Sequence, residues 1–186
     1  MRREFFRVTD HFAVFGVPRA AWVDAEELKA RFHRLSAERH PDAAGGDGAA
    51  FTELNAAWQA LREPAGCLRH FLALEHPDAL APAGQTPAEL SDLFMEIAAF
   101  RQAAQKFGAK YSAATSPLTK AVLEAERVTL RTRLTALTVN VEARTEQSLA
   151  TLRSDATQPS QLATLLASLV FLAKWTAQLD ELRLNS

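Results

Sequence analysis

The chain has 186 residues, a length that suits one or two small domains with enough apolar material for a core. Its formal net charge of -1 gives no overall field that would attract nucleic acid, so charge-based recognition requires a local patch. The single cysteine, Cys67, excludes an internal disulfide and a multi-cysteine zinc site, which fits a reducing compartment.

The N-terminal segment contains no apolar core typical of a signal peptide, because Thr9, Asp10 and His11 interrupt its apolar run. No uninterrupted apolar segment approaches the roughly 20 residues that a membrane-spanning helix needs. We therefore expect a soluble cytoplasmic protein with neither a membrane nor a nucleic acid as its partner.

The first part of the chain is expected to be helical, since glycine and proline are sparse and β-branched alternation is nearly absent. A short helix over 10–16 should close at Gly16. Asp24 is a good N-cap for a second helix that should end near Arg39, because Pro41 disfavours helical geometry in the residue before it. A third helix is expected at about 49–62, and a fourth apolar segment at 67–74.

Proline and glycine residues between 77 and 87 predict a linker. Three helices are expected beyond it, near 88–107, 117–153 and 160–183. The middle helix is long and has an approximate heptad seam, formed by Leu123, Leu130, Leu134, Leu137 and Val141. The predicted architecture is all-α, with an N-terminal helical hairpin module at 1–76, a linker at 77–87 and a C-terminal three-helix bundle at 88–186.

The tripeptide His-Pro-Asp occurs twice, at 40–42 and at 76–78. The first copy lies between two helices that a short loop makes antiparallel, so its side chains are presented at an exposed bend. The second half of the helix before it is basic, with Lys29, Arg31, Arg34 and Arg39 against Glu38 alone. A proline-rich linker follows the second copy, so we interpret that copy as a helix stop.

Residues 10–74 resemble a J-domain, and two segments resemble the HscB-type J-proteins more closely than the DnaJ type: DHFAVFGVPRAAWVDAEELKARFHRLSAERHPD and LNAAWQALREPAGCLRHFLAL. The resemblance implies a hairpin that presents the His-Pro-Asp loop to an ATPase chaperone of the HscA/DnaK class. Carried over by position, it implies that the chaperone-binding residues are Lys29, His33, Arg34, His40, Pro41 and Asp42. Position 33 is often basic in this family, so the histidine here predicts weaker docking at neutral pH.

These residue types suit recognition in trans. Asp42 can accept a bidentate arginine, Pro41 restricts the loop, and a basic helix mainly raises the encounter rate. Nucleotide hydrolysis would belong to the partner, so we expect no catalytic residue, no cofactor and no enzymatic activity in this chain.

The sequence also contains residues that could bind a metal and a cysteine that could act as a nucleophile. A metal site formed by His33, His40, Asp42 and Asp47 lacks a compact ligand spacing, so no metal is expected. Cys67 lies in an apolar segment, which indicates a small core residue and not a nucleophile.

The segments LFMEIAAFRQ (93–102) and VFLAKW (170–175) resemble those by which HscB-type proteins contact an IscU-type iron–sulfur scaffold. Helical periodicity places the core stripe of the first segment at Leu93, Ile97, Phe100, Ala104 and Phe107. Met95 then points to the opposite side, and Phe94 lies on the flank beside Ala98. An exposed Met and Phe suit either a partner surface or packing on the J-domain.

In the last helix the core stripe is expected to be Leu162, Leu165, Leu169, Leu172 and Leu179. Phe171 lies away from that stripe, on the side of Trp175 and Leu182, which is either a partner surface or a second packing surface. The predicted scaffold-binding residues are Phe94, Met95, Ala98 and Phe171. Ala99 and Gln102 stand where the family often has acidic residues, so scaffold recognition is more apolar here or the client differs.

The sequence therefore predicts a co-chaperone that stimulates an HscA/DnaK-class ATPase and delivers an iron–sulfur scaffold protein to it. The alternative is a chaperone-independent helical binding module whose J-like part is only structural.

Overall fold

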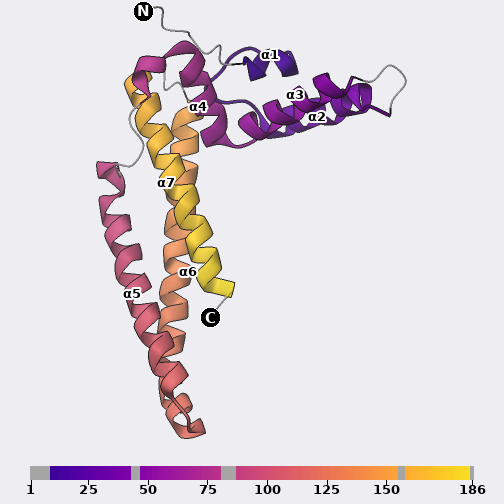
Figure 1. Cartoon of the computed structure of the whole chain (residues 1–186). Helices are drawn as coiled ribbons and strands as arrows, with labels where there is room; N and C mark the ends of the chain where they lie inside the picture. Colours follow the sequence, from indigo (N-terminus) through magenta and orange to yellow (C-terminus); the bar gives the residue numbers. More distant parts are fainter. Residues whose placement is uncertain (1–8, 43–46, 81–86, 155–157, 185–186) are drawn as a thin grey trace, which may run out of the picture. The chain divides into compact units, whose positions relative to one another are not determined.

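The computed structural model describes residues 9–42, 47–80, 87–154 and 158–184. Within these ranges the chain is helical and contains no strand, which confirms the all-α prediction (Figure 1). The elements are α1 (His11–Phe15), α2 (Ala25–Arg39), α3 (Gly48–Leu61), α4 (Pro64–Glu75), the 3₁₀ turns η1 (Pro77–Ala79) and η2 (Ala88–Leu90), α5 (Ser91–Ala113), α6 (Pro117–Arg153) and α7 (Pro159–Leu184).

The chain divides into two compact units. The first contains residues 1–83 and 149–166, and the second contains 84–148 and 167–186. The division after residue 83 falls inside the predicted linker. The first unit also includes the end of α6 and the start of α7, where Arg153 lies over the ring of Trp22 at 5.6 Å.

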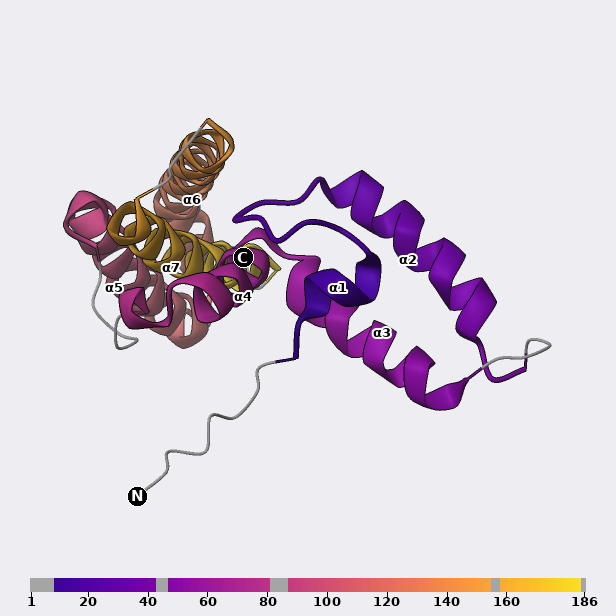
Figure 2. The same ribbon diagram turned by 90° about the horizontal axis from the view of Figure 1, so that it is seen from above.

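In the first unit, α2 and α3 lie side by side as an antiparallel hairpin (Figure 2). Their rings stack at Phe32 and Trp58, with centroids 4.7 Å apart, and α1 packs against α3. The buried core residues of the hairpin and its neighbours are Phe12, Phe15, Leu28, Leu54, Ala57, Leu61 and Cys67. Leu28 belongs to this core and Phe32 and Leu35 pack against it, so one apolar face of α2 holds the hairpin together.

Local chemistry sets the ends of these helices. Asp10 and Asp24 cap α1 and α2, each accepting backbone N–H groups of the first turn, and such caps contribute about 1 kcal/mol each. Gly16 closes α1 in the left-handed region, with φ of 63°, where a side chain would cause strain. The second helix ends at Arg39, and His40 before Pro41 is extended, as predicted.

The fourth helix begins at Pro64, earlier than the predicted apolar segment 67–74. Proline is well suited to a first helical position, because the N–H it lacks has no partner there. Gly66 lets α4 approach α3 closely: a Cβ at Gly66 would lie 2.4 Å from the carbonyl oxygen of Ala60.

The second unit is a bundle whose core takes residues from three helices. They are Leu93, Ile97 and Phe100 of α5, Leu134, Leu137 and Val141 of α6, and Leu172, Trp175 and Leu179 of α7. All of them except Trp175 belong to the predicted core stripes; the sequence places Trp175 beside Phe171, away from the stripe, whereas it is buried in the core. The fifth helix extends past the predicted end near residue 107, since Gly108 continues the helix and the rings of Phe107 and Tyr111 lie 5.7 Å apart across it.

The composition of α7 bears on the expectation that no uninterrupted apolar segment approaches the length of a membrane span. Among the described residues one stretch, Pro159–Arg183, is long and apolar enough to span a bilayer, with a mean hydropathy of 1.5 over its most apolar part. Serine, threonine and glutamine residues interrupt the apolar run of this stretch, but its mean hydropathy stays as high as that of a membrane-spanning helix. A core helix of a soluble protein has the same composition, and Leu172, Trp175 and Leu179 of α7 are buried, so we interpret α7 as a core helix.

Candidate functional site

The first His-Pro-Asp tripeptide lies at the end of α2, and all three residues are exposed. The ring of His40 packs edge-on against Phe51 of α3, with centroids 5.2 Å apart. Its Nδ1 accepts a hydrogen bond from the Asp42 N–H at 3.2 Å, so the ring proton is on Nε2 in this arrangement. These two contacts fix His40 on the hairpin.

The Asp42 side chain is 91% exposed, with its Oδ2 3.6 Å from His40 Nδ1. A carboxylate in this position contributes little to the fold and is open to a partner. Of the short loop that the sequence predicts between α2 and α3, residues 43–46 lie outside the described residues.

The basic face of α2 is smaller than a count of its charges indicates. Lys29, His33 and Arg34 are exposed, as expected of docking residues. Arg31 instead pairs with Glu27 at 2.8 Å and donates to the carbonyl oxygens of Phe15 and Gly16 at 3.5 and 3.4 Å. Arg31 therefore joins α2 to the end of α1.

The second tripeptide terminates a helix, as the sequence predicts. The His76 N–H donates to the Leu72 carbonyl at 2.8 Å, and Pro77 begins the 3₁₀ turn η1. The ring of His76 packs edge-on against Phe71, with centroids 5.9 Å apart. The two copies thus differ in setting: the first links two helices of a hairpin, and the second caps α4.

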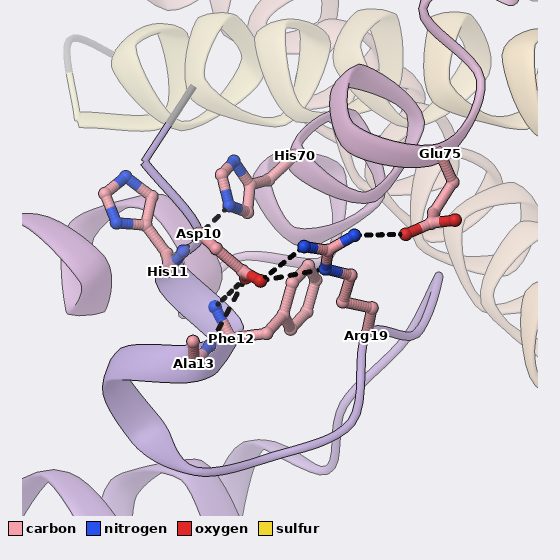
Figure 3. A network of polar contacts seen from close by, with 7 residues as sticks. All are labelled: Asp10, His11, Phe12, Ala13, Arg19, His70 and Glu75. Atoms are coloured by element: carbon pink, nitrogen blue, oxygen red, sulfur yellow. Dashed lines mark hydrogen bonds and ion pairs between the residues drawn. The ribbon is translucent and has the colours of Figure 1, made fainter. Parts of the chain in front are cut away.

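A polar network that sequence reasoning missed ties α1 to α4 (Figure 3). Asp10 accepts from the N–H groups of Phe12 and Ala13 and from Arg19, and Arg19 also bonds to Glu75 at 2.7 Å. Burial raises the pKa of the Asp10 carboxyl, but the hydrogen bonds from Arg19 and the backbone outweigh it and hold the pKa below its ordinary value. Arg19 thereby bridges the start of α1 and the end of α4.

Beside this network His70 Nε2 accepts the backbone N–H of His11 at 3.1 Å, and the two rings lie 4.6 Å apart (Figure 3). Burial lowers the pKa of His70, and the nearby His11 lowers it further. Burial also lowers the pKa of His11, although Glu53 and Asp10 partly offset this. A sequence signal was available, because His70 follows Cys67 by one helical turn on the apolar face of α4.

Cys67 is a core residue, as predicted. Its side chain is buried, its Sγ lies 3.7 Å from the Ala20 carbonyl oxygen, and burial raises the pKa of the thiol to about 12. A thiol with so high a pKa is a poor nucleophile at neutral pH. Across the described parts of the chain, no three His, Cys, Asp or Glu side chains come together as metal ligands would.

Two of the four predicted scaffold-binding residues, Phe94 and Phe171, lie beside a buried tryptophan in the second unit. Phe94 and Met95 of α5 are 44% and 65% exposed, whereas Ala98 and Phe171 are partly buried. The ring of Trp175 lies 5.8 Å from that of Phe171 and 6.3 Å from that of Phe94. Phe171 therefore packs on the bundle core, as one of the two alternatives from the sequence predicts, and its role in a partner surface stays a prediction.

Comparisons with known proteins found similarity in sequence to a domain family and similarity in structure to a chaperone. Residues 10–70 match the model of the DnaJ domain. The chaperone HscB from Vibrio cholerae has a similar structure, with a TM-score of 0.61 over 94% of this chain and 98% of that chain, at 20% sequence identity. No curated protein matches the chain in sequence. The DnaJ match includes the exposed tripeptide at 40–42, the basic face of α2 and the residues of the α1–α4 network except Glu75. Residues 10–70 therefore match a DnaJ domain, and the chain as a whole has the fold of HscB.

Proposed function

We propose that the chain is a non-enzymatic, soluble cytoplasmic co-chaperone that stimulates the ATPase of an HscA/DnaK-class heat-shock chaperone. The observation that carries the proposal is the exposed His40-Pro41-Asp42 tripeptide at the tip of the α2–α3 hairpin of a DnaJ domain. In this proposal the chain also delivers an IscU-type iron–sulfur scaffold protein to the chaperone during cluster assembly or transfer.

The tripeptide has the features of a preorganised contact. The Asp42 carboxylate is open to solvent and can accept the two parallel N–H bonds of an arginine, which is a strong and directional pair. His40 is already held by Phe51 and by the backbone of Asp42, so binding requires little further ordering of its side chain.

The basic face of α2 would act before contact. Lys29 and Arg34 are exposed and attract an acidic surface over distances of about a Debye length, roughly 10 Å at moderate salt. Such steering raises the association rate and orients the complex more than it adds affinity. Once bound, the chain would promote hydrolysis by the difference in its affinity for the two conformations of the chaperone.

The client surface in this proposal comprises Phe94, Met95, Ala98 and Phe171. Large apolar side chains as exposed as Phe94 and Met95 suit a partner surface, and methionine adapts to irregular partners. Trp175 beneath the two phenylalanines makes a firm base for them. Ala99 and Gln102 are exposed and uncharged, which favours a scaffold contact with a larger apolar share.

The test is stimulation of a purified HscA-type ATPase by the wild-type chain, by His40→Gln and by His76→Gln. We expect His40→Gln to abolish stimulation and His76→Gln to retain it, with equal helicity by circular dichroism. The matched pair changes the same residue type in the same tripeptide, so equal losses would contradict the role assigned to His40. Scaffold binding without any stimulation would favour the chaperone-independent binding module.

A further inference from the structure

A groove in the second unit continues the line of α7. The last turn of α7 contributes Leu182 to it, while α5 and α6 run on side by side past the end of α7 (Figure 1). The groove encloses about 800 Å³, and its walls come from α5 between Ala98 and Ser112 and from α6 between Arg127 and Leu134. Near the core the third position of the bundle is filled by α7, and farther along the α5–α6 pair none of the described helices occupies it.

The floor of this groove is apolar and has helical spacing. Phe100, Ala104 and Phe107 contribute from successive turns of α5, and Leu130 and Leu134 from successive turns of α6. Beside them is Gly108, where an added Cβ would meet no atom within 4 Å. A trough between two helices, with small residues and open space along one wall, has the shape that receives a third helix.

The charged residues that line the groove are all of one sign. They are Arg101, Arg127 and Arg131, and no carboxylate is among the lining residues. Arg127 also pairs with Glu124 at 2.7 Å. The carboxylate partly offsets the positive charge of Arg127 but does not use all five of its N–H donors. The rim therefore favours acidic side chains and disfavours basic ones.

We propose that the groove binds an amphipathic helix of a partner protein, with its apolar stripe on the α5–α6 floor and acidic side chains toward the three arginines. This interaction goes beyond the proposed function. The groove shares Ala98 with the scaffold-binding surface but includes none of Phe94, Met95 and Phe171.

The test uses the full chain and two fluorescein-labelled synthetic helices of about 15 residues, long enough to form a helix on binding. Both peptides have leucine at i, i+4, i+7 and i+11. One has glutamate at the flanking positions, and the other has lysine there. By fluorescence anisotropy at low salt, the acidic peptide should bind about tenfold more tightly than the basic one, and added salt should shrink the difference.

Two pairs of variants locate the peptide. Gly108→Leu fills open space in the groove and favours the helix, so it should lower affinity for the acidic peptide about tenfold without harming the fold. Ala109→Leu is its control, because Ala109 is exposed and does not line the groove. Arg101→Glu should weaken binding, whereas Lys106→Glu, the same charge change outside the groove, should not.

Four results would overturn the proposal. The peptides could bind equally, or Gly108→Leu could leave the affinity for the acidic peptide unchanged. Sedimentation could instead show a dimer that Gly108→Leu dissociates, which would assign the groove to a second copy of the chain. The wild type could also bind oleate but neither peptide, with oleate binding lost in Gly108→Leu. That result would assign the groove to a small anionic amphiphile. Chaperone stimulation and scaffold binding should survive Gly108→Leu, so failure of the proposed function would be seen separately.

Discussion

Acid should weaken the first compact unit through His70. A protonated imidazole has no lone pair, so His70 would lose the hydrogen bond that its Nε2 accepts from the His11 N–H. The new charge would lie beside the ring of His11 and near Arg19, while Asp10 would offset part of this repulsion. The neutral form of His70 is therefore the one that the fold stabilises.

The sign of the effect follows from the lowered pKa values of His70 and His11. Each is below the ordinary value of 6.5 in the folded chain, so the unfolded chain binds more protons as the pH falls past that value. The contribution of the neutral pair is complete above pH 6.5 and is lost as the pH falls through the folded pKa values. Since His70 is only 8% exposed, an unpaired His11 N–H beside it should cost about 1–3 kcal/mol.

Urea unfolding followed by circular dichroism at several pH values between 7 and 5 measures this effect. His70→Gln can keep an acceptor for the His11 N–H but does not titrate, so its stability should depend less on pH than that of the wild type. His70→Leu has no acceptor and should be destabilised across the whole range. If wild type and His70→Gln lose stability in parallel as the pH falls, His70 is not the group responsible.

Three further changes test other parts of the structure. Gly66→Ala should destabilise the chain by about 1–3 kcal/mol in thermal unfolding, because the new Cβ would lie 2.4 Å from the Ala60 oxygen; a gain in stability would show that helix propensity outweighs the clash. Lys29→Ala combined with Arg34→Ala should slow association with the chaperone in stopped-flow measurements, and the wild-type rate should fall with salt. A salt-independent rate would remove α2 as the steering face. Met95→Ala should weaken scaffold binding by about 1–2 kcal/mol in calorimetry at an unchanged melting temperature, since the side chain is 65% exposed; the reverse result would make Met95 a core residue.

Helix ends were predictable where one residue decides the local geometry. Asp24, Gly16 and Pro41 each act on their immediate neighbours, and the structure has the predicted N-cap, helix end and helix stop at these positions. The ends of α4 and α5 were missed because they depend on context. Pro64 starts a helix when it is the first residue, and Gly108 continues one when its neighbours pack.

The candidate site was predictable in its location but not in its internal contacts. A charge count treats every arginine of α2 as available, yet Glu27 and the carbonyl oxygens at the end of α1 and at its C-cap hold Arg31. His11 and His70 are 59 positions apart, so no local pattern could pair them. Long-range pairs of this kind depend on the tertiary structure that brings α1 against α4.

Residues that present the tripeptide and residues that would meet a partner are largely separate. Phe51 holds His40, and the Phe32–Trp58 stack sets the spacing of α2 and α3, so changes at these aromatic residues should alter both stability and partner binding. Asp42 is nearly fully exposed, so substitutions of this residue can change partner binding with little effect on the stability of the fold. A loss of chaperone binding at unchanged stability therefore indicates the contact surface, whereas a joint loss indicates its support.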